Sequence, residues 1–134
     1  MKEEGNRPAA NGLQIPARLR AVGPGWHPLL NRLHAQLSMA VPGYRLTDVK
    51  EKLGGLRVHV ATGEQVVPEE VRALVAAAAA EAAATCEFCG AVGRPRSRSD
   101  VPGGWIKTAC DSCHTDWSAH KLLIVHGAVL RRSL

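Results

Sequence analysis

The sequence has few aromatic residues, only four cysteines and no long apolar run. Its 134 residues include one Phe, one Tyr and three Trp, so we expect a small core that is mostly aliphatic. No apolar run approaches the roughly 20 residues that a membrane-spanning helix requires, which predicts a soluble protein without a membrane partner. Residues 1–12 are polar and lack the apolar stretch of a secretory signal, so we expect a cytoplasmic protein.

The cysteines form two C-x-x-C pairs, which twenty residues separate. Zinc binds four thiolates at the corners of a tetrahedron, with Zn–S distances of about 2.3 Å, and two pairs at this spacing are typical of a structural zinc site. Two disulfides are an alternative, but cytosolic thiols stay reduced; a redox-active C-x-x-C is another. The sequence therefore predicts one Zn²⁺ bound by Cys86, Cys89, Cys110 and Cys113.

An amphipathic helix is predicted near the start of residues 24–85. Apolar residues recur at helical spacing over residues 29–37, and Pro28 stands where a first helical turn tolerates proline. The helix should end at residues 41–43, which contain Pro and Gly.

A β-hairpin and a second helix follow. The segments 44–53 and 56–62 flank Gly54-Gly55, and a glycine pair between extended segments is typical of a hairpin turn with positive φ. Pro68 then opens a second helix, whose alanine-rich end runs directly into Cys86.

The cysteine-containing part has an order of its own. Residues 86–90 resemble a zinc knuckle, an arginine-rich loop and a short strand over residues 105–108 follow, and the second pair begins a helix. This order is that of a treble-clef zinc finger, and a zinc ribbon is the alternative. Residues 122–125 could extend the helix or form a strand, because periodicity cannot choose for so short an apolar run.

The predicted fold class is therefore α+β. A helix, a β-hairpin and a helix are followed by a treble-clef-like or zinc-ribbon module. Residues 1–23 are predicted to be a flexible arm, of which Leu13, Ile15 and Leu19 could dock a short part. Residues 24–85 form the αββα unit, and residues 86–134 form the zinc-binding module packed on it.

The sequence favours a protein without enzymatic activity. It contains no phosphate-cradling glycine loop, nucleophile elbow or H-E-x-x-H motif. A nuclease of the ββα-metal class needs a general-base histidine between the pairs, and residues 90–109 contain none. A degenerate treble-clef nuclease using His114 is the less favoured alternative, and His114 or His120 could also replace one cysteine ligand.

Two groups of basic residues could bind an anionic partner. The first group lies between the cysteine pairs and consists of Arg94, Arg96, Arg98 and Lys107. The second group lies on the hairpin and consists of Lys50, Lys52, Arg57 and His59. Arginine presents a planar fork that suits phosphates and carboxylates. The alternative for both groups is an ordinary solvated surface.

Two tryptophans of the cysteine-containing part allow two interpretations. Trp105 and Trp117 could act as platforms on which nucleic-acid bases stack. Large aromatic side chains more often contribute through buried area, so we expect both tryptophans in a small core that covers the metal site.

Several segments together resemble a set of small uncharacterised proteins of bacteriophage and bacterial genomes. These proteins carry a KEKFGGLR hairpin ahead of a zinc-type C-x-x-C-G. The matching strings are Gly25-Trp26…Leu29-Leu30, residues 49–57 (VKEKLGGLR), residues 86–90 (CEFCG) and residues 104–110 (GWIKTAC). The resemblance covers roughly residues 24–114, with Leu53 where the pattern has an aromatic residue. It implies a phage-related context and the αββα-plus-zinc layout, and it transfers no catalytic residues.

These observations give two functional hypotheses. The net charge of +5 and the two basic groups favour a zinc-stabilised protein that binds nucleic acid, mainly through the loop between the pairs with help from the hairpin. The alternative is a protein-interaction module that binds an acidic protein surface, such as a phage-derived inhibitor or adaptor of a host complex, with zinc purely structural.

Overall fold

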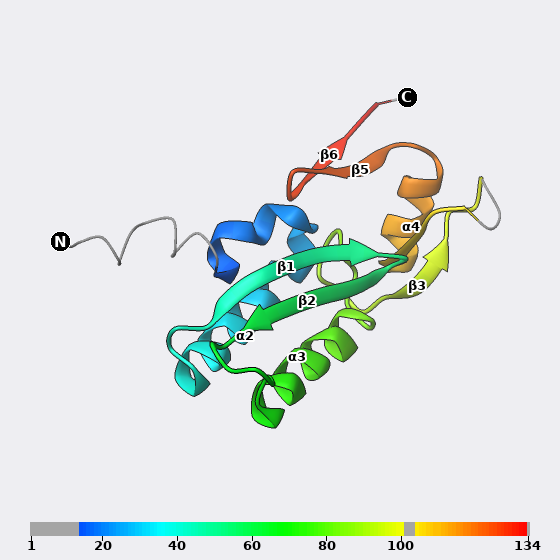
Figure 1. Cartoon of the computed structure of the whole chain (residues 1–134). Helices are drawn as coiled ribbons and strands as arrows, with labels where there is room; N and C mark the ends of the chain where they lie inside the picture. Colours follow the sequence, from blue (N-terminus) through cyan, green and yellow to red (C-terminus); the bar gives the residue numbers. More distant parts are fainter. Residues whose placement is uncertain (1–13, 101–103, 134) are drawn as a thin grey trace.

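The computed structural model describes residues 14–100 and 104–133. Its elements are η1 (Ile15–Ala21), η2 (Pro24–Trp26), α2 (His27–Ala40), β1 (Arg45–Lys52), β2 (Gly55–Ala61), α3 (Glu69–Ala82), β3 (Arg94–Ser97), β4 (Ile106–Ala109), α4 (Asp111–Ser118), β5 (Leu122–Val125) and β6 (Ala128–Arg131). The strands form three antiparallel hairpins, β1–β2, β3–β4 and β5–β6 (Figure 1). This mixture of helices and small antiparallel sheets confirms the predicted α+β class. Within the described residues, every helix is too short or too polar to cross a membrane.

Helix α2 forms as the sequence predicts. Pro28 lies in its first turn, and the helix ends at Ala40, one residue before the C-cap Val41. The apolar stripe is fully used, since each of its members is at most 3% exposed: Leu29, Leu30, Leu33 and Leu37.

The hairpin β1–β2 is confirmed, but its turn lies one residue earlier than predicted. Lys52 pairs with Gly55, so the turn consists of Leu53 and Gly54, with φ values of 54° and 83°. A type I′ hairpin turn needs positive φ at both central residues, and Gly55 is already part of the strand. Leu53 adopts this less favourable conformation with its side chain 67% exposed.

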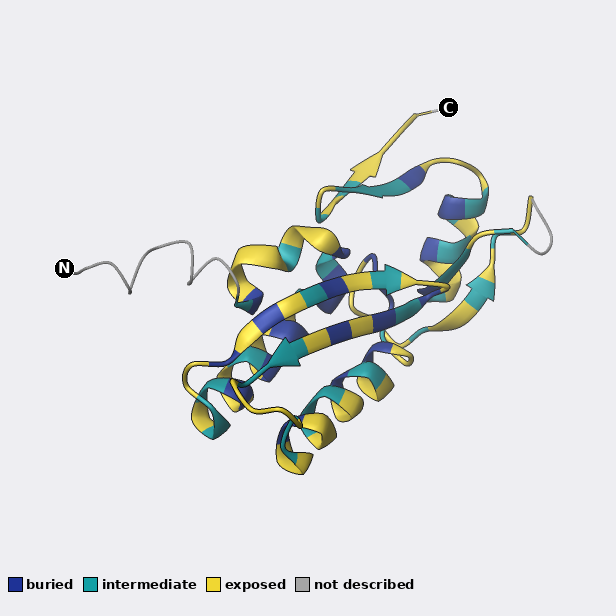
Figure 2. Cartoon of the chain, viewed as in Figure 1, coloured by how far each residue is buried: buried dark blue, intermediate teal, exposed yellow. Residues whose placement is uncertain are grey.

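The two long helices cover one face of this hairpin (Figure 1). Leu56 and Val58 of β2 are buried against the helices, and Arg57 and His59 lie on the opposite, exposed face (Figure 2). The second predicted helix is confirmed as α3, whose Ala78 and Ala82 are buried. Alanine side chains let α3 approach its neighbours closely, which explains the alanine-rich sequence.

Residues 14–23 of the predicted arm are docked on the core, as was expected of Ile15 and Leu19, whereas residues 1–13, with Leu13, lie outside the described residues. Ile15 and Val22 are each 1% exposed, and Leu19 packs against the same core. The Tyr44 hydroxyl accepts a hydrogen bond from the Ile15 N–H at 3.0 Å. The segment folds as the short 3₁₀ helix η1, whose few apolar side chains dock individually. Its sequence therefore shows no helical periodicity that would have marked it as part of the core.

The C-terminal tail forms a hairpin rather than an extension of α4. Its turn consists of His126 and Gly127, with φ values of 51° and 81°, which meets the same primed-turn requirement. The turn lies against η1, since a Cβ on Gly127 would be 2.5 Å from the Cα of Arg20. The segment η1 therefore contacts both the αββα unit and the C-terminal hairpin.

Candidate metal centre and binding surface

The four cysteines converge in one cluster. All four Sγ atoms lie within 4.8 Å of one another, and those of Cys89 and Cys110 are 3.7 Å apart. A regular tetrahedron with metal–sulfur distances of about 2.3 Å has edges of about 3.8 Å, so the spacing fits a single four-coordinate ion. All four are free thiols, so the structure contains one group of four ligands and no disulfide among them. The cluster could therefore hold a metal ion.

Each half of the cysteine cluster is positioned by a different local structure. The first pair lies in a tight turn after α3, in which Gly90 donates its N–H to the Cys86 carbonyl at 2.9 Å and adopts a φ of 86°. The second pair begins α4, with Cys110 as N-cap. The Cys113 N–H donates to the Cys110 Sγ at 3.4 Å, and the Ala91 N–H donates to the Cys89 Sγ at 3.4 Å.

The environment separates the pKa values of the two thiols at the start of α4. Burial raises the pKa of Cys113 well above its ordinary value, and its hydrogen bond with Cys110 adds to this effect. Burial also acts to raise the pKa of Cys110, but hydrogen bonds from the Cys113 backbone N–H and from neighbouring thiols outweigh it and leave the pKa lowered. In the metal-free protein Cys113 therefore keeps its proton, and metal binding at this position must release it.

A small core covers the cysteine cluster, and it contains one of the two predicted tryptophans. Trp117 is 6% exposed and packs on Phe88, with ring centroids 6.1 Å apart. The prediction is wrong for Trp105, which is 70% exposed. Trp105 directly precedes the short strand β4, where local sequence does not determine the buried face.

Neither candidate histidine belongs to the cysteine cluster. His114 Nε2 lies 2.7 Å from the Ser97 carbonyl oxygen, and His120 Nε2 lies 2.8 Å from an Asp100 carboxylate oxygen. Within the described residues, only the four cysteines bring metal-ligating side chains close enough together to share one ion.

Glu87, between the first two cysteines, was not singled out from sequence but joins three parts of the fold. Its side chain is 1% exposed and lies 3.0 Å from Lys107 Nζ. Its other carboxylate oxygen accepts the Gly23 N–H at 2.9 Å. The neighbouring Gly25 fits only without a side chain, because a Cβ there would be 2.0 Å from the Cys86 carbonyl oxygen. An acid between two cysteines of a knuckle is the one sequence signal that could have pointed to this role.

Lys107, which was predicted to belong to a binding group, forms ion pairs with two glutamates. Its Nζ lies between Glu87 and Glu51, at 3.2 Å from the Glu51 carboxylate, and only 19% of its side chain is exposed. Glu51 also accepts the Gly54 N–H at 2.8 Å, and the Gly54 carbonyl accepts the Thr108 hydroxyl at 2.7 Å. The tip of the β1–β2 hairpin is thereby fastened to β4.

The arginines between the cysteine pairs are partly neutralised. Arg96 binds Asp111 at 2.8 Å, and this contact lowers the pKa of the Asp111 carboxyl. Arg98 binds Asp100 at 2.7 Å and lies over the Trp117 ring, 5.8 Å from its centroid. Arg94 is exposed and has no ion pair with a carboxylate of the described residues. Of this predicted group, the structure leaves Arg94 as the most available cation.

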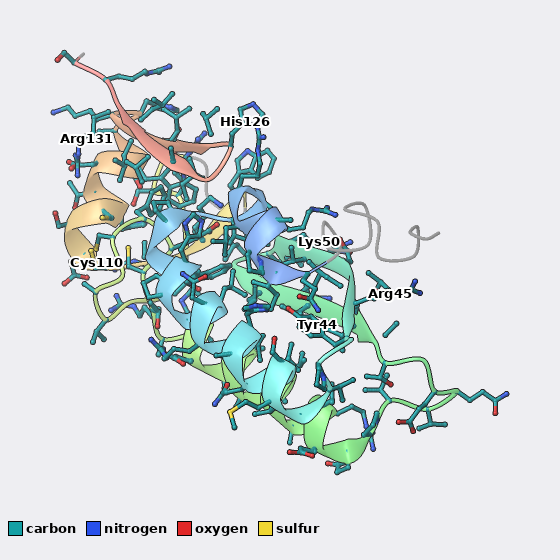
Figure 3. All side chains as sticks on the ribbon, turned by 90° about the vertical axis from the view of Figure 1, so that its left-hand side faces the viewer. Tyr44, Arg45, Lys50, Cys110, His126 and Arg131 are labelled. Carbon is teal, nitrogen blue, oxygen red and sulfur yellow. The ribbon has the colours of Figure 1, made fainter. Side chains whose placement is uncertain are left out.

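The basic residues of the hairpin are brought together on its outer face. Lys50 lies directly opposite Arg57, and Lys52 is two residues further along the same strand face. All three are at least partly exposed, although Lys50 also lies 3.3 Å from Asp48. Figure 3 shows Arg45, on the same strand, at the side of the hairpin away from α2.

A hollow of about 430 Å³ lies at the tip of this hairpin. Its lining includes Lys52, Leu53 and Trp105, so the exposed indole adjoins the basic face, and it also includes Glu51, which pairs with Lys107. We call this surface the hairpin-tip surface; it comprises Lys50, Lys52, Leu53, Arg57 and Trp105. The sequence did not predict that Trp105 and Leu53 lie at one surface. They are far apart in sequence, and only the fold brings them together.

Comparison of the chain with models of known protein families, with curated proteins and with solved structures finds no match.

Proposed function

We propose that the cysteine cluster binds zinc and that the ion is structural. Four thiolates with no histidine or water position form a closed tetrahedral set, and such sets are typical of structural zinc. The order of elements supports a treble-clef module: a knuckle at residues 86–90, the hairpin β3–β4, and α4 carrying the second pair. Bound zinc would contribute directly to folding free energy, because its ligands converge only in the folded chain.

We further propose that this module presents a non-enzymatic surface that binds single-stranded nucleic acid. The observation that carries the proposal is Trp105, 70% exposed at the edge of the hollow that Lys52 also lines. A base can stack on the indole while Lys50, Lys52 and Arg57 contact phosphates along the outer face of the hairpin. Stacking platforms beside a basic track are the usual means of binding single strands without strict sequence preference.

The proposal moves the main contact away from the loop between the cysteine pairs. Arg96 and Arg98 already bind carboxylates, and Lys107 is held between two glutamates. Arg94 is the remaining exposed member of that group, and it lines a different hollow, beside Cys110 and Asp111.

Binding of fluorescent oligothymidylate and oligouridylate tests the proposal. Base stacking is worth about 1–3 kcal/mol, so Trp105→Ala should weaken binding by roughly 5- to 150-fold. Lys50→Ala and Arg57→Ala together should flatten the dependence of log affinity on log salt by about 0.7 for each phosphate that the variant no longer neutralises. Arg20→Ala is the control, since it removes one exposed positive charge from η1. A second control, Arg32→Ala, removes from α2 an arginine that pairs with Glu81.

Two results would overturn the nucleic-acid proposal. The first is no binding of either oligonucleotide at physiological salt. The second is binding that Trp105→Ala leaves unchanged, or that either control substitution weakens as much as the hairpin substitutions do.

A protein-interaction module is the second candidate function. The observation that favours it is an apolar groove beside β2, lined by residues other than those of the Trp105 hollow. In that case zinc has the same structural role, and the partner is a protein.

A further inference from the structure

The apolar groove lies between strand β2 and helix α3 and has a volume of about 370 Å³. Five consecutive residues of β2, from Leu56 to Val60, line it. Successive side chains of a strand point to opposite faces, so a groove that meets all five must run along the edge of the strand. The helix contributes the far wall, which consists of Val71, Arg72, Val75, Ala76 and Ala79.

The edge of β2 that faces the groove is unpaired. Within the described residues β2 pairs only with β1, in a two-stranded sheet. An edge strand presents backbone N–H and C=O groups that can pair with another strand. Here these groups lie beside an apolar wall, in which Ala76 and Ala79 contribute only small side chains.

The formally charged side chains that line the groove are both arginines. Arg57 and Arg72 line it together with His59, and its described lining contains no acidic residue. Arg72 also contacts Glu69, which precedes it by one turn of α3. A strand that enters the groove would therefore meet apolar side chains on one side and guanidinium groups at the rim.

We propose that this groove binds an extended peptide segment of a partner protein, in which apolar and acidic residues alternate. The segment adds a third strand at the β2 edge. Its apolar residues pack between β2 and the valines of α3, and its carboxylates contact Arg57 and Arg72. This is β-strand addition, in which backbone hydrogen bonds give affinity and the alternate side chains give specificity. The groove shares no lining residue with the Trp105 hollow, although Arg57 belongs both to the groove and to the hairpin-tip surface.

A second copy of this chain fits the groove less well. Antiparallel pairing of two β2 edges about this part of the strand would bring Arg57 of one copy close to Arg57 of the other. Like charges that face each other across paired strands destabilise the pairing. The charge of the rim thus selects an acidic strand over β2 itself.

Two synthetic octapeptides test the proposal on the full-length, zinc-loaded protein, one alternating valine with glutamate and the other valine with lysine. The glutamate peptide should bind, and the lysine peptide should bind at least tenfold more weakly. Ala76→Glu places a carboxylate in the groove and should weaken binding of the glutamate peptide at least tenfold. The matched control is Ala77→Glu, the same substitution at an exposed position of α3 that does not line the groove; it should leave binding unchanged.

Amide hydrogen exchange supplies a readout that does not depend on any variant. Bound peptide should slow exchange at alternate amides of residues 56–60, namely those that point toward the unpaired edge. Absence of binding by the glutamate peptide at millimolar concentration overturns the proposal. So do equal effects of the two alanine substitutions, equal affinity for the two peptides, or protection that maps to the Trp105 hollow and not to β2.

Discussion

Replacing Lys107 by methionine should lower the free energy of unfolding by about 3 kcal/mol, because it leaves the Glu87 carboxylate buried without its cation. Glu87 is 1% exposed and Lys107 19% exposed, so the pair lies close to the buried limit, in which removal of one partner costs about 3–5 kcal/mol. The slight exposure of Lys107 places the expected loss at the lower end. The substitution also frees Glu51, which is 21% exposed and can be hydrated.

Denaturant unfolding with zinc in slight excess measures this loss. The control is Lys50→Met, which removes a lysine from the pair with Asp48, whose side chains are 52% and 36% exposed; it should cost less than about 1 kcal/mol. The double variant Glu87→Gln with Lys107→Met should recover much of the loss, because the amide oxygen can still accept the Gly23 N–H and no buried charge remains.

Equal costs of Lys107→Met and Lys50→Met would refute this interpretation of the buried pair. So would a double variant that is no more stable than Lys107→Met, since the loss would then not arise from an unpaired Glu87.

Three further outcomes are expected. Gly25→Ala should destabilise the protein by about 1–3 kcal/mol in denaturant unfolding, because the new Cβ would lie 2.0 Å from the Cys86 carbonyl oxygen. The control Gly43→Ala, whose Cβ would have nothing within 4 Å, should change stability by less than about 1 kcal/mol. Equal effects of the two substitutions would contradict the close packing at Gly25. Trp117→Ala should cost about 3–5 kcal/mol and Trp105→Ala less than about 1 kcal/mol, since their exposed fractions are 6% and 70%; the reverse order would be inconsistent with this structure. Zinc affinity, measured by chelator competition, should rise with pH. Burial raises the pKa of Cys113, so zinc binding must displace the proton of this thiol. A zinc affinity that does not change with pH would show that the thiols are already ionised before zinc binds.

Local signals in the sequence were sufficient for the helices and the first hairpin. The leucine spacing of α2, the glycine pair of the hairpin and the alanine-rich α3 each depend on residues within a few positions. The cysteine cluster was also predictable, because the C-x-x-C spacing reflects the coordination geometry of the ion itself. The turn of the first hairpin nevertheless lies one residue earlier than predicted. Either of the two adjacent glycines could provide the second positive φ of the turn.

The contacts that join these parts could not be predicted. Lys107 is basic in sequence and is neutralised only because Glu51 and Glu87 arrive from 56 and 20 residues away. Arg96 and Arg98 become less available in the same way, through Asp111 and Asp100. A count of basic residues therefore led to the prediction of a binding loop, but three of the four cations in that group form ion pairs in the folded chain.

Exposure of Trp105 was missed for a related reason. The strand that follows it is four residues long, too short for alternation to mark an inward face, and aromatic residues are more often buried. The hollow that Trp105 shares with the hairpin tip depends on Gly54, which packs against β4 so closely that a Cβ would be 2.9 Å from the Ile106 side chain.

The most direct test of the metal centre is the metal content of the purified protein, measured by elemental analysis together with native mass spectrometry. We expect one zinc ion per chain, absence of that ion in Cys110→Ser, and unfolding of the part around α4 when a strong chelator removes it. A metal-free protein that keeps its fold and stability in the presence of chelator, or one whose four cysteines form two disulfides, would contradict the proposed structural zinc.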